Sequence, residues 1–232
     1  MTSPASPTPS RHAAANATAD TRARFVRTVY RHLGGGIAVF AAASWWLHTS
    51  GVGETIAGLV IATNWLLILG GFMLVSYLAT SLAASAERSG GGYVGYGLLI
   101  AANALLFATP IHVAIEFADV DMALAVGITG AVFGVLTVVG LTTVKDLSAW
   151  GGILKLVGLG VLGLIVASVL FGWQLGVWFI GGMLIFSGAA ILYETQQVLR
   201  RYPVERPVPA AMTLFSSVAL LFWYVLMLLM RR

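Results

Sequence analysis

Long apolar stretches alternate with short polar connections along almost the whole chain. Each apolar run is long enough to cross a bilayer as a helix, which takes about 20 residues. The runs predict seven transmembrane helices, at residues 29–48, 56–82, 94–115, 122–142, 151–171, 175–198 and 209–230. The connections between them contain the glycine, proline and charged residues that are typical of loops. We therefore predict an all-α integral membrane protein, with one seven-helix transmembrane domain over residues 25–232.

Composition supports this class and excludes several others. Hydrophobic residues make up 59% of the chain and charged residues only 9%. Seven such helices in 232 residues leave no room for a soluble domain of the usual size. The chain has no cysteine, which excludes disulfides, thiol catalysis and thiolate metal sites.

Residues 1–24 differ from the rest because they are rich in proline, serine, threonine and arginine. Such a segment cannot bury enough apolar surface to fold alone, so we predict a flexible cytosolic N-terminal arm. An arginine-rich, acid-poor start is also typical of a mitochondrial transit peptide, which stays an alternative.

The distribution of charge predicts the orientation in the membrane. Before the last helix, the lysines and arginines fall on the side of the N-terminal arm, whereas the opposite connections contain only acids: Glu54, Glu116, Asp119 and Asp121. The excess of positive charge on cytoplasmic loops then predicts a cytosolic N-terminus and, after seven crossings, an external C-terminus. Arg231 and Arg232 do not follow this rule, and we expect them to anchor the last helix at the headgroups. The balance of +4 thus indicates membrane orientation and no nucleic-acid partner.

Glu194 is the most informative single residue, because it lies inside the sixth apolar run. The next charges along the chain are Arg200 and Arg201, which places the carboxylate about two turns inside the membrane boundary. Taking a carboxylate out of water costs several kcal/mol unless it is protonated or paired, so Glu194 is expected to face the bundle interior, a cavity or a partner. The alternative is that its side chain bends back to the headgroups or to Arg201.

Small and polar residues around Glu194 define the candidate site. Ser187, Ala190 and Ile191 lie on the same helical face as Glu194, so this face is expected to contact protein and not lipid. The candidate pore or proton-sensing residues are Glu194, Tyr193, Thr195 and Asp146. The polar residues that could reach them are Ser187, Gln196, Thr213, Ser216 and Ser217. Ordinary interhelical contacts are the alternative for each of these.

Glycines on the predicted fourth, fifth and sixth helices predict close helix packing. They are Gly127, Gly130, Gly134, Gly158, Gly160, Gly163, Gly181, Gly182 and Gly188.

The inventory of reactive groups argues against an enzyme. The four histidines, His12, His32, His48 and His112, lie in the arm or near helix ends, where none could act as a deep general base. The chain contains no HExxH motif, and its last helix has no lysine for a Schiff base. His112 and Glu116 are spaced as a pair but lack a third ligand, so no metal site is predicted. We expect no cofactor, with calcium or protons as the ligands left open.

Two motifs carry a resemblance to a known family. The fourth connection reads VVGLTTVKDLSAWGG and the sixth helix ends AAILYETQQVLRR, followed by a final apolar helix. In this order they resemble the Bax inhibitor-1 family, and most closely its YccA-like bacterial branch. Thr143, Lys145, Asp146, Leu147, Ser148, Gly151 and Gly152 match the loop motif, and Ile191, Leu192, Tyr193, Glu194 and Thr195 match the helix motif. The similarity covers residues 25–230.

The resemblance implies a bundle of six helices around a central seventh, in the inner membrane of a bacterium. It also implies one of two activities: a pH-sensitive calcium leak, or restraint of a membrane-bound FtsH-type protease under stress. In the leak, the acid of the sixth helix pairs with an aspartate of the seventh. Glu194 matches the first position, and the comparison places the second at or near Val225, which binds neither a cation nor a proton.

Two hypotheses follow from the sequence. The first is a modulator of membrane-protein quality control that interacts with an FtsH-type protease, favoured by the YccA-like motifs and by valine at position 225. The second is a calcium, cation or proton leak gated at Glu194. The sequence leaves the oligomeric state open.

Overall fold

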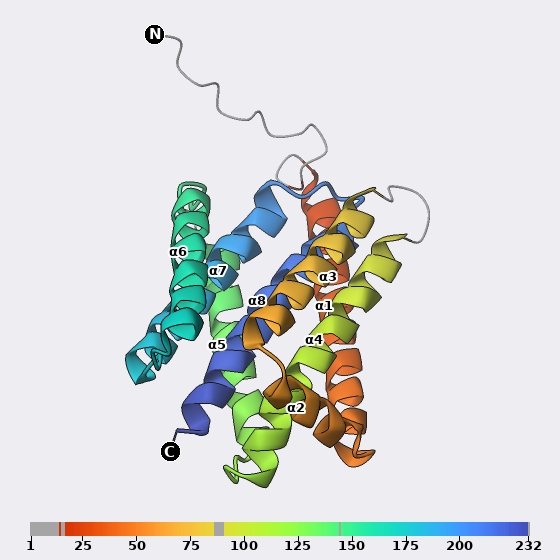
Figure 1. The fold of residues 1–232 in the computed structure, drawn as a ribbon. Coiled ribbons are helices and arrows are strands. Elements are labelled where there is room, and N and C mark those ends of the chain that lie inside the picture. The colour runs from red at the N-terminus through yellow and green to blue at the C-terminus, as the bar shows by residue number, and fades with distance from the viewer. Residues whose placement is uncertain (1–13, 15–16, 86–90, 144, 232) are drawn as a thin grey trace.

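The computed structural model describes residue 14 and residues 17–85, 91–143 and 145–231. Within these ranges the regular structure consists of eight helices (Figure 1): α1 (Ala19–Thr49), α2 (Val52–Ala62), α3 (Trp65–Ser85), α4 (Gly91–Glu116), α5 (Met122–Thr142), α6 (Trp150–Phe171), α7 (Val177–Arg200) and α8 (Pro207–Leu229). The predicted all-α class is confirmed.

Six of the described helices, α3 to α8, are long and apolar enough to cross a membrane. The first predicted span lies within α1, which has 31 residues but is not among these six. The count of seven crossings therefore stays a prediction. Figure 1 shows that α1 begins at one end of the bundle and α8 finishes at the other. We call the end where α1 begins the arm end, and the other the distal end.

The second predicted span, residues 56–82, is wrong as one continuous helix, because the chain breaks between α2 and α3. Thr63 adopts an extended backbone, with φ −105° and ψ 151°, and so ends α2. The side chain of Asn64 then accepts a hydrogen bond from the backbone N–H of Leu66 at 2.9 Å. This local bond satisfies a donor at the start of α3 that has no partner within the helix.

Helix α8 forms the interior of the bundle. In the apolar stretch of α8, 61% of the residues are buried, against 6% in that of α6. It packs against α1, α3, α4, α5 and α7, whereas α6 packs chiefly on α7 at the side of the bundle (Figure 1). The core around α8 is aromatic: Phe107 stacks on Phe222 at 5.6 Å and meets Phe40 edge-on at 5.2 Å between ring centroids. The predicted arrangement of six helices around a central seventh stays a prediction, since α2 and α6 scarcely reach α8.

Large apolar side chains cover the outer faces of the bundle. Trp45, Trp46, Trp173 and Trp178 are exposed near helix ends at the distal end, and Trp178 is 91% exposed. Tryptophans at this level are typical of the membrane–water interface. An exposed apolar surface of this extent, on helices of membrane length, supports a bilayer environment.

Close packing occurs at other glycines than those the sequence indicated. A Cβ on Gly140 would lie 2.9 Å from Thr195, and one on Gly151 would meet the Tyr193 hydroxyl at 2.3 Å, so helix α7 approaches these two backbones closely. Gly158 and Gly188 would make ordinary contacts. The packing prediction is wrong for the glycines at which an added Cβ would have nothing within 4 Å: Gly127, Gly130, Gly134, Gly160, Gly163, Gly181 and Gly182.

The N-terminal arm lies mostly outside the described residues. Helix α1 begins at Ala19, capped by the side chain of Thr18, so the last residues of the predicted arm are helical. The buried Ala14 is fastened to the connection between α7 and α8, because its N–H donates to the Tyr202 carbonyl at 3.1 Å. The Arg22 side chain donates to the carbonyl of Ala14 at 3.2 Å. The arm is therefore attached to the arm end of the bundle at Ala14.

Candidate functional site

The Glu194 carboxylate is held between two helices. Glu194 lies on α7, and one of its oxygens accepts a hydrogen bond from the hydroxyl of Ser217 on α8 at 2.6 Å. Ser187, Ala190 and Ile191 on the same face are buried, with Ser187 and Ile191 fully so. Their burial confirms the predicted orientation of this face toward protein.

Glu194 also lines two clefts. The first, which we call the arm-end cleft, has a volume of about 710 Å³ and extends to the α7–α8 connection, with Arg201, Tyr202 and Arg206 in its wall. The second, the lateral cleft, has about 640 Å³ and lies between α3, α4, α6, α7 and α8. Both clefts share four lining residues, Thr80, Tyr193, Glu194 and Ser216. The Glu194 carboxylate thus lies where the arm-end cleft and the lateral cleft adjoin.

The other predicted polar partners bind elsewhere. The Thr213 hydroxyl donates to the Pro209 carbonyl at 3.1 Å, which leaves its oxygen to accept a hydrogen bond from Tyr202 at 2.7 Å. Ser216 and Ser187 each donate to a carbonyl of their own helix, Ser216 to Met212 at 3.1 Å and Ser187 to Leu184 at 2.9 Å. Of the last-helix candidates, Ser217 is therefore the one that bonds to Glu194.

Thr195 and Tyr193 fix α7 against its neighbours. Thr195 is fully buried against Gly140. The ring of Tyr193 lies over Gly151, where a side chain would leave no room for it. A structural role in positioning α7 accounts for the contacts of both residues.

Gln196 joins the two sequence motifs. Its side-chain oxygen accepts from the backbone N–H of Leu147 at 2.7 Å, and its nitrogen donates to the carbonyl of Lys145 at 2.6 Å. A longer bond reaches the carbonyl of Thr143 at 3.5 Å. Because Gln196 is buried, these bonds satisfy backbone groups of the connection that water reaches poorly. A single side chain of α7 thus sets the shape of the α5–α6 connection.

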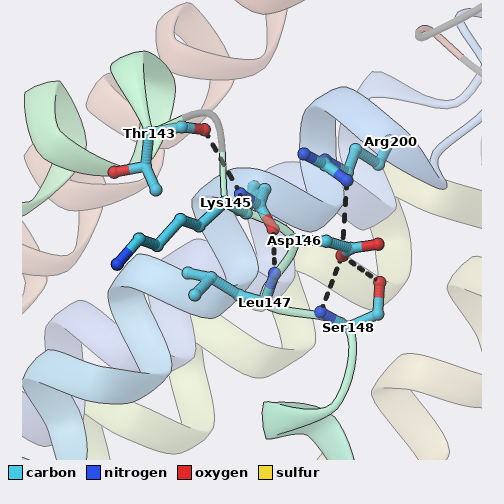
Figure 2. A network of polar contacts seen from close by, with 7 residues as sticks. Thr143, Lys145, Asp146, Leu147, Ser148 and Arg200 are labelled. Carbon is cyan, nitrogen blue, oxygen red and sulfur yellow. Dashed lines mark hydrogen bonds and ion pairs between the residues drawn. The ribbon is translucent and has the colours of Figure 1, made fainter.

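A second contact fastens the same connection from outside. Figure 2 shows the Asp146 carboxylate between Ser148 and Arg200. One Asp146 oxygen accepts from the backbone N–H of Ser148 at 2.9 Å and also from its hydroxyl. The Arg200 guanidinium lies 3.3 Å from that oxygen. Asp146 is exposed and lies outside both clefts, so the structure does not bring it together with Glu194.

Two groups outside the helices have shifted pKa values. The hydrogen bonds from Ser148, and then the charge of Arg200, hold the pKa of the Asp146 carboxyl below its usual range. Burial raises the pKa of the Tyr202 hydroxyl, so this group stays neutral at physiological pH. Tyr202 is therefore a donor in the wall of the arm-end cleft.

Val225 does not lie opposite Glu194, contrary to the expected register. The residue in contact with Glu194 is Ser217, which precedes Val225 by eight positions, or about 12 Å along the helix. Val225 is buried in the apolar core and lines neither of the two clefts. The α8 residue that faces Glu194 is therefore Ser217, which carries a hydroxyl. Ser217 does not provide a second carboxylate at this contact.

Thr80 and Gln197 are among the polar cleft residues that were not anticipated from the sequence. Thr80 of α3 lines both clefts, and Gln197 lines the arm-end cleft with neither atom of its amide bonded within the described part of the chain. Gln197 follows Glu194 by three positions and so shares its helical face, a spacing that could have revealed it. Nothing in the sequence brings α3 to the site.

The described residues hold no group of three or more acids or histidines placed to bind a metal ion. Glu116 lies 3.9 Å from the His48 ring, and His112 instead packs against Phe117. The arrangement at Glu194 is thus one carboxylate among hydroxyl groups. It can accept and release a proton and donate or accept hydrogen bonds along the shared wall of the clefts.

Comparison with known proteins identifies the family. The sequence model of the family described as "Inhibitor of apoptosis-promoting Bax1" matches residues 22–232. A comparison with curated proteins finds no match. The matched region includes the whole helical bundle from the first turn of α1 onward, together with both motifs that Gln196 joins. The chain therefore belongs to the Bax inhibitor-1 family, as a multi-pass membrane protein.

Proposed function

We propose that this Bax inhibitor-1 family protein is a leak pathway for protons, with Glu194 as the group that carries the proton between the two clefts. The observation that carries the proposal is the position of Glu194, which lines both clefts and bonds to Ser217. A leak therefore ranks above protease modulation, the reverse of the order that the sequence favoured.

Hydroxyl groups next to the carboxylate provide a route for a proton. Tyr193, Ser216 and Thr80 line both clefts together with Glu194. Each hydroxyl can donate one hydrogen bond and accept another, so these groups and water in the clefts can relay a proton to and from the acid. Ionisable residues inside a membrane bundle are typical of such relays.

Calcium fits the site less well than a proton does. Calcium prefers six to eight oxygen ligands with more than one carboxylate. At Glu194 the contacting residue of α8 is Ser217, whose hydroxyl carries no charge. The site therefore supports proton transfer more strongly than calcium binding.

Flux measurements in liposomes test this proposal. Vesicles with a pH-sensitive dye inside are given a pH gradient, and parallel vesicles carry a calcium indicator. We expect the parent to dissipate the pH gradient with little calcium entry, and Glu194→Gln to slow the proton flux at least tenfold. The matched control is Glu54→Gln on α2, which removes an exposed acid and should keep the parental rate. Equal rates for Glu194→Gln and the parent would exclude the proposal.

Modulation of an FtsH-type protease is the second candidate, and one observation favours it. The two motifs that resemble the YccA-like branch meet at the arm end, where Gln196 and Arg200 hold the α5–α6 connection. Lys145 and Asp146 are exposed on this surface and are accessible to a partner. Co-purification from native membranes, followed by mass spectrometry, tests it. The protease should be recovered with the parent and lost with Lys145→Glu, and its absence from the parent would exclude this function.

The orientation belongs to the same proposal. We infer an inner-membrane protein with a cytosolic N-terminus and an external C-terminus, which places the arm-end cleft on the cytosolic side. The supporting observation is the cluster of basic residues at that end, among them Arg201 and Arg206 in the cleft wall. Reporter fusions at Arg232 test it: a reporter that is active only outside the cytosol should be active, and activity of a cytosol-only reporter would reverse the orientation.

A further inference from the structure

A third cavity lies in the distal half of the bundle, away from Glu194. It has a volume of about 300 Å³ and is lined by residues of α1, α4, α5 and α8. Its floor is the buried face of α8, where Phe215, Ala219 and Phe222 are each less than a tenth exposed. Nearly all of the wall is apolar, so water gains few hydrogen bonds there and an apolar occupant is favoured.

The cavity opens toward lipid between α1 and α5. These two helices touch through the rings of Tyr30 and Phe133, 6.4 Å apart, but their backbones stay apart, although both helices pack on α8. Trp45 of α1 and Val126 of α5 line the cavity and are also 68% and 58% exposed on the outer surface. A molecule in the bilayer can therefore reach α8 through the gap between α1 and α5.

One end of the cavity is polar, and polar atoms there lack hydrogen-bond partners among the described residues. Ser44 lines the wall and is 7% exposed, and its hydroxyl has no hydrogen-bond partner among the described residues. The Nδ1 atom of His48, one turn further along α1, has none there either. A buried hydroxyl without a partner costs about 1–3 kcal/mol. An occupant with a hydrogen-bond acceptor at this end would offset that cost.

The depth of Ser44 in the membrane indicates which hydrogen-bond acceptor the occupant provides. Helix α1 ends at Thr49, among exposed tryptophans that mark the membrane interface. Ser44 lies five residues before that end, or about 7 Å inside it. The ester carbonyls of phospholipids lie just below the headgroups, at this level of the bilayer.

We propose that the cavity is a binding site for one acyl chain of a phospholipid from the leaflet at the distal end. The chain lies on Phe215, Ala219 and Phe222 of α8, and its ester carbonyl accepts a hydrogen bond from Ser44. This site is separate from Glu194, and it places a lipid in direct contact with the helix at the centre of the bundle. It does not depend on the proposed leak.

Photolabelling tests the site. The parent is placed in vesicles of phosphatidylcholine that carries a diazirine group in one acyl chain, irradiated, digested and mapped by mass spectrometry. We expect adducts on Phe215, Val218 and Phe222 of α8, which are buried and which line this cavity but not the lateral cleft. Adducts on the outward-facing Val135 and Val138 report ordinary lipid contact. Labelling of those two residues without labelling of α8 would overturn the proposal.

Matched variants on α5 provide the control. Gly130 lines the cavity and has open space around it, so Gly130→Leu should fill the cavity without a clash. Gly134 has the same open space but does not line the cavity. We expect α8 adducts to fall at least fivefold in Gly130→Leu and to stay at the parental level in Gly134→Leu. Undiminished α8 adducts in a folded Gly130→Leu protein would overturn the proposal.

The identity of the acceptor is tested with two further probes. An ether-linked analogue of the photoreactive lipid lacks the ester carbonyl, so it should label α8 several-fold less than the ester does. In Ser44→Ala, which removes the hydroxyl, both lipids should label α8 equally weakly. Equal labelling by the two lipids in the parent would overturn the role of the ester. Labelling of α8 by a photoreactive fatty acid but not by the phospholipid would overturn the choice of lipid.

Discussion

The hydroxyl of Ser217 on α8 donates a hydrogen bond to the carboxylate of Glu194 on α7, with 2.6 Å between the two oxygens. This bond joins the acid predicted from the sequence to the helix at the centre of the bundle. It also identifies the α8 position that would have to carry an acid for a carboxylate pair to exist.

Substitutions of Glu194 test whether the side chain depends on this contact. Glu194→Gln keeps an oxygen that accepts from Ser217, so its thermal stability in detergent should stay close to that of the parent. Glu194→Lys cannot accept this bond and places an ammonium group among donors, which should destabilise the protein by roughly 1.5–3 kcal/mol. If both variants melt like the parent, the carboxylate does not lie in the bundle.

The corrected register predicts where an acid pair can be made. Ser217→Asp places a second carboxylate in hydrogen-bond reach of Glu194, and two such groups share a proton and titrate as a unit. Two carboxylates also provide the anionic ligands that calcium prefers, so this variant should gain calcium flux in liposomes. Adding Glu194→Gln should abolish the gain.

The control for this prediction is Val225→Asp. It adds the same acid to α8 in the apolar core, about 12 Å from Ser217 along the helix. It should lower stability without any gain in calcium flux. A gain of flux with Val225→Asp and none with Ser217→Asp would favour the register that the sequence comparison indicated.

The Gln196 side chain is predicted to hold the α5–α6 connection in place. Gln196→Ala removes its bonds to Leu147 and Lys145 and leaves these backbone groups without a partner, which should cost about 1–3 kcal/mol. Hydrogen exchange should become faster at residues 145–149. Gln197→Ala removes the neighbouring amide, which has no bond within the described part of the chain, and should leave that exchange unchanged. Equal exchange in the two variants would contradict the role of Gln196.

The pH dependence of this connection follows from Asp146. Because the pKa of Asp146 is lower in the folded protein than its ordinary value of 3.8, the contribution of this group is fully present above that value. It is lost only as the pH falls through the still lower pKa of the folded state. We therefore expect the fluorescence of the nearby Trp150, compared with a Trp150→Phe variant, to stay constant from pH 7 to pH 5 and to change below about pH 4. A change centred near pH 6 would contradict this prediction.

Several features of the protein were determined by the sequence alone. Apolar runs of membrane length require helices, because backbone groups in lipid have to bond within their own segment. The family followed from two motifs, and the burial of Ser187, Ala190 and Ile191 followed from their spacing before Glu194. These features depend on local pattern, which the order of residues states directly.

Other features depended on how the helices pack against one another. The sequence could not indicate that Ser217, and not Val225, meets Glu194, because this depends on how far α8 is shifted along α7. The break at Thr63 lies within an apolar run, so the sequence did not reveal it. A glycine also looks the same in the sequence whether it packs closely on another helix, as Gly140 does, or has open space around it, as Gly130 does. The two clefts at Glu194 require α3, far away in the chain, to supply Thr80. Register, facing and cavity shape arise from contacts between distant segments, and only the tertiary structure decides them.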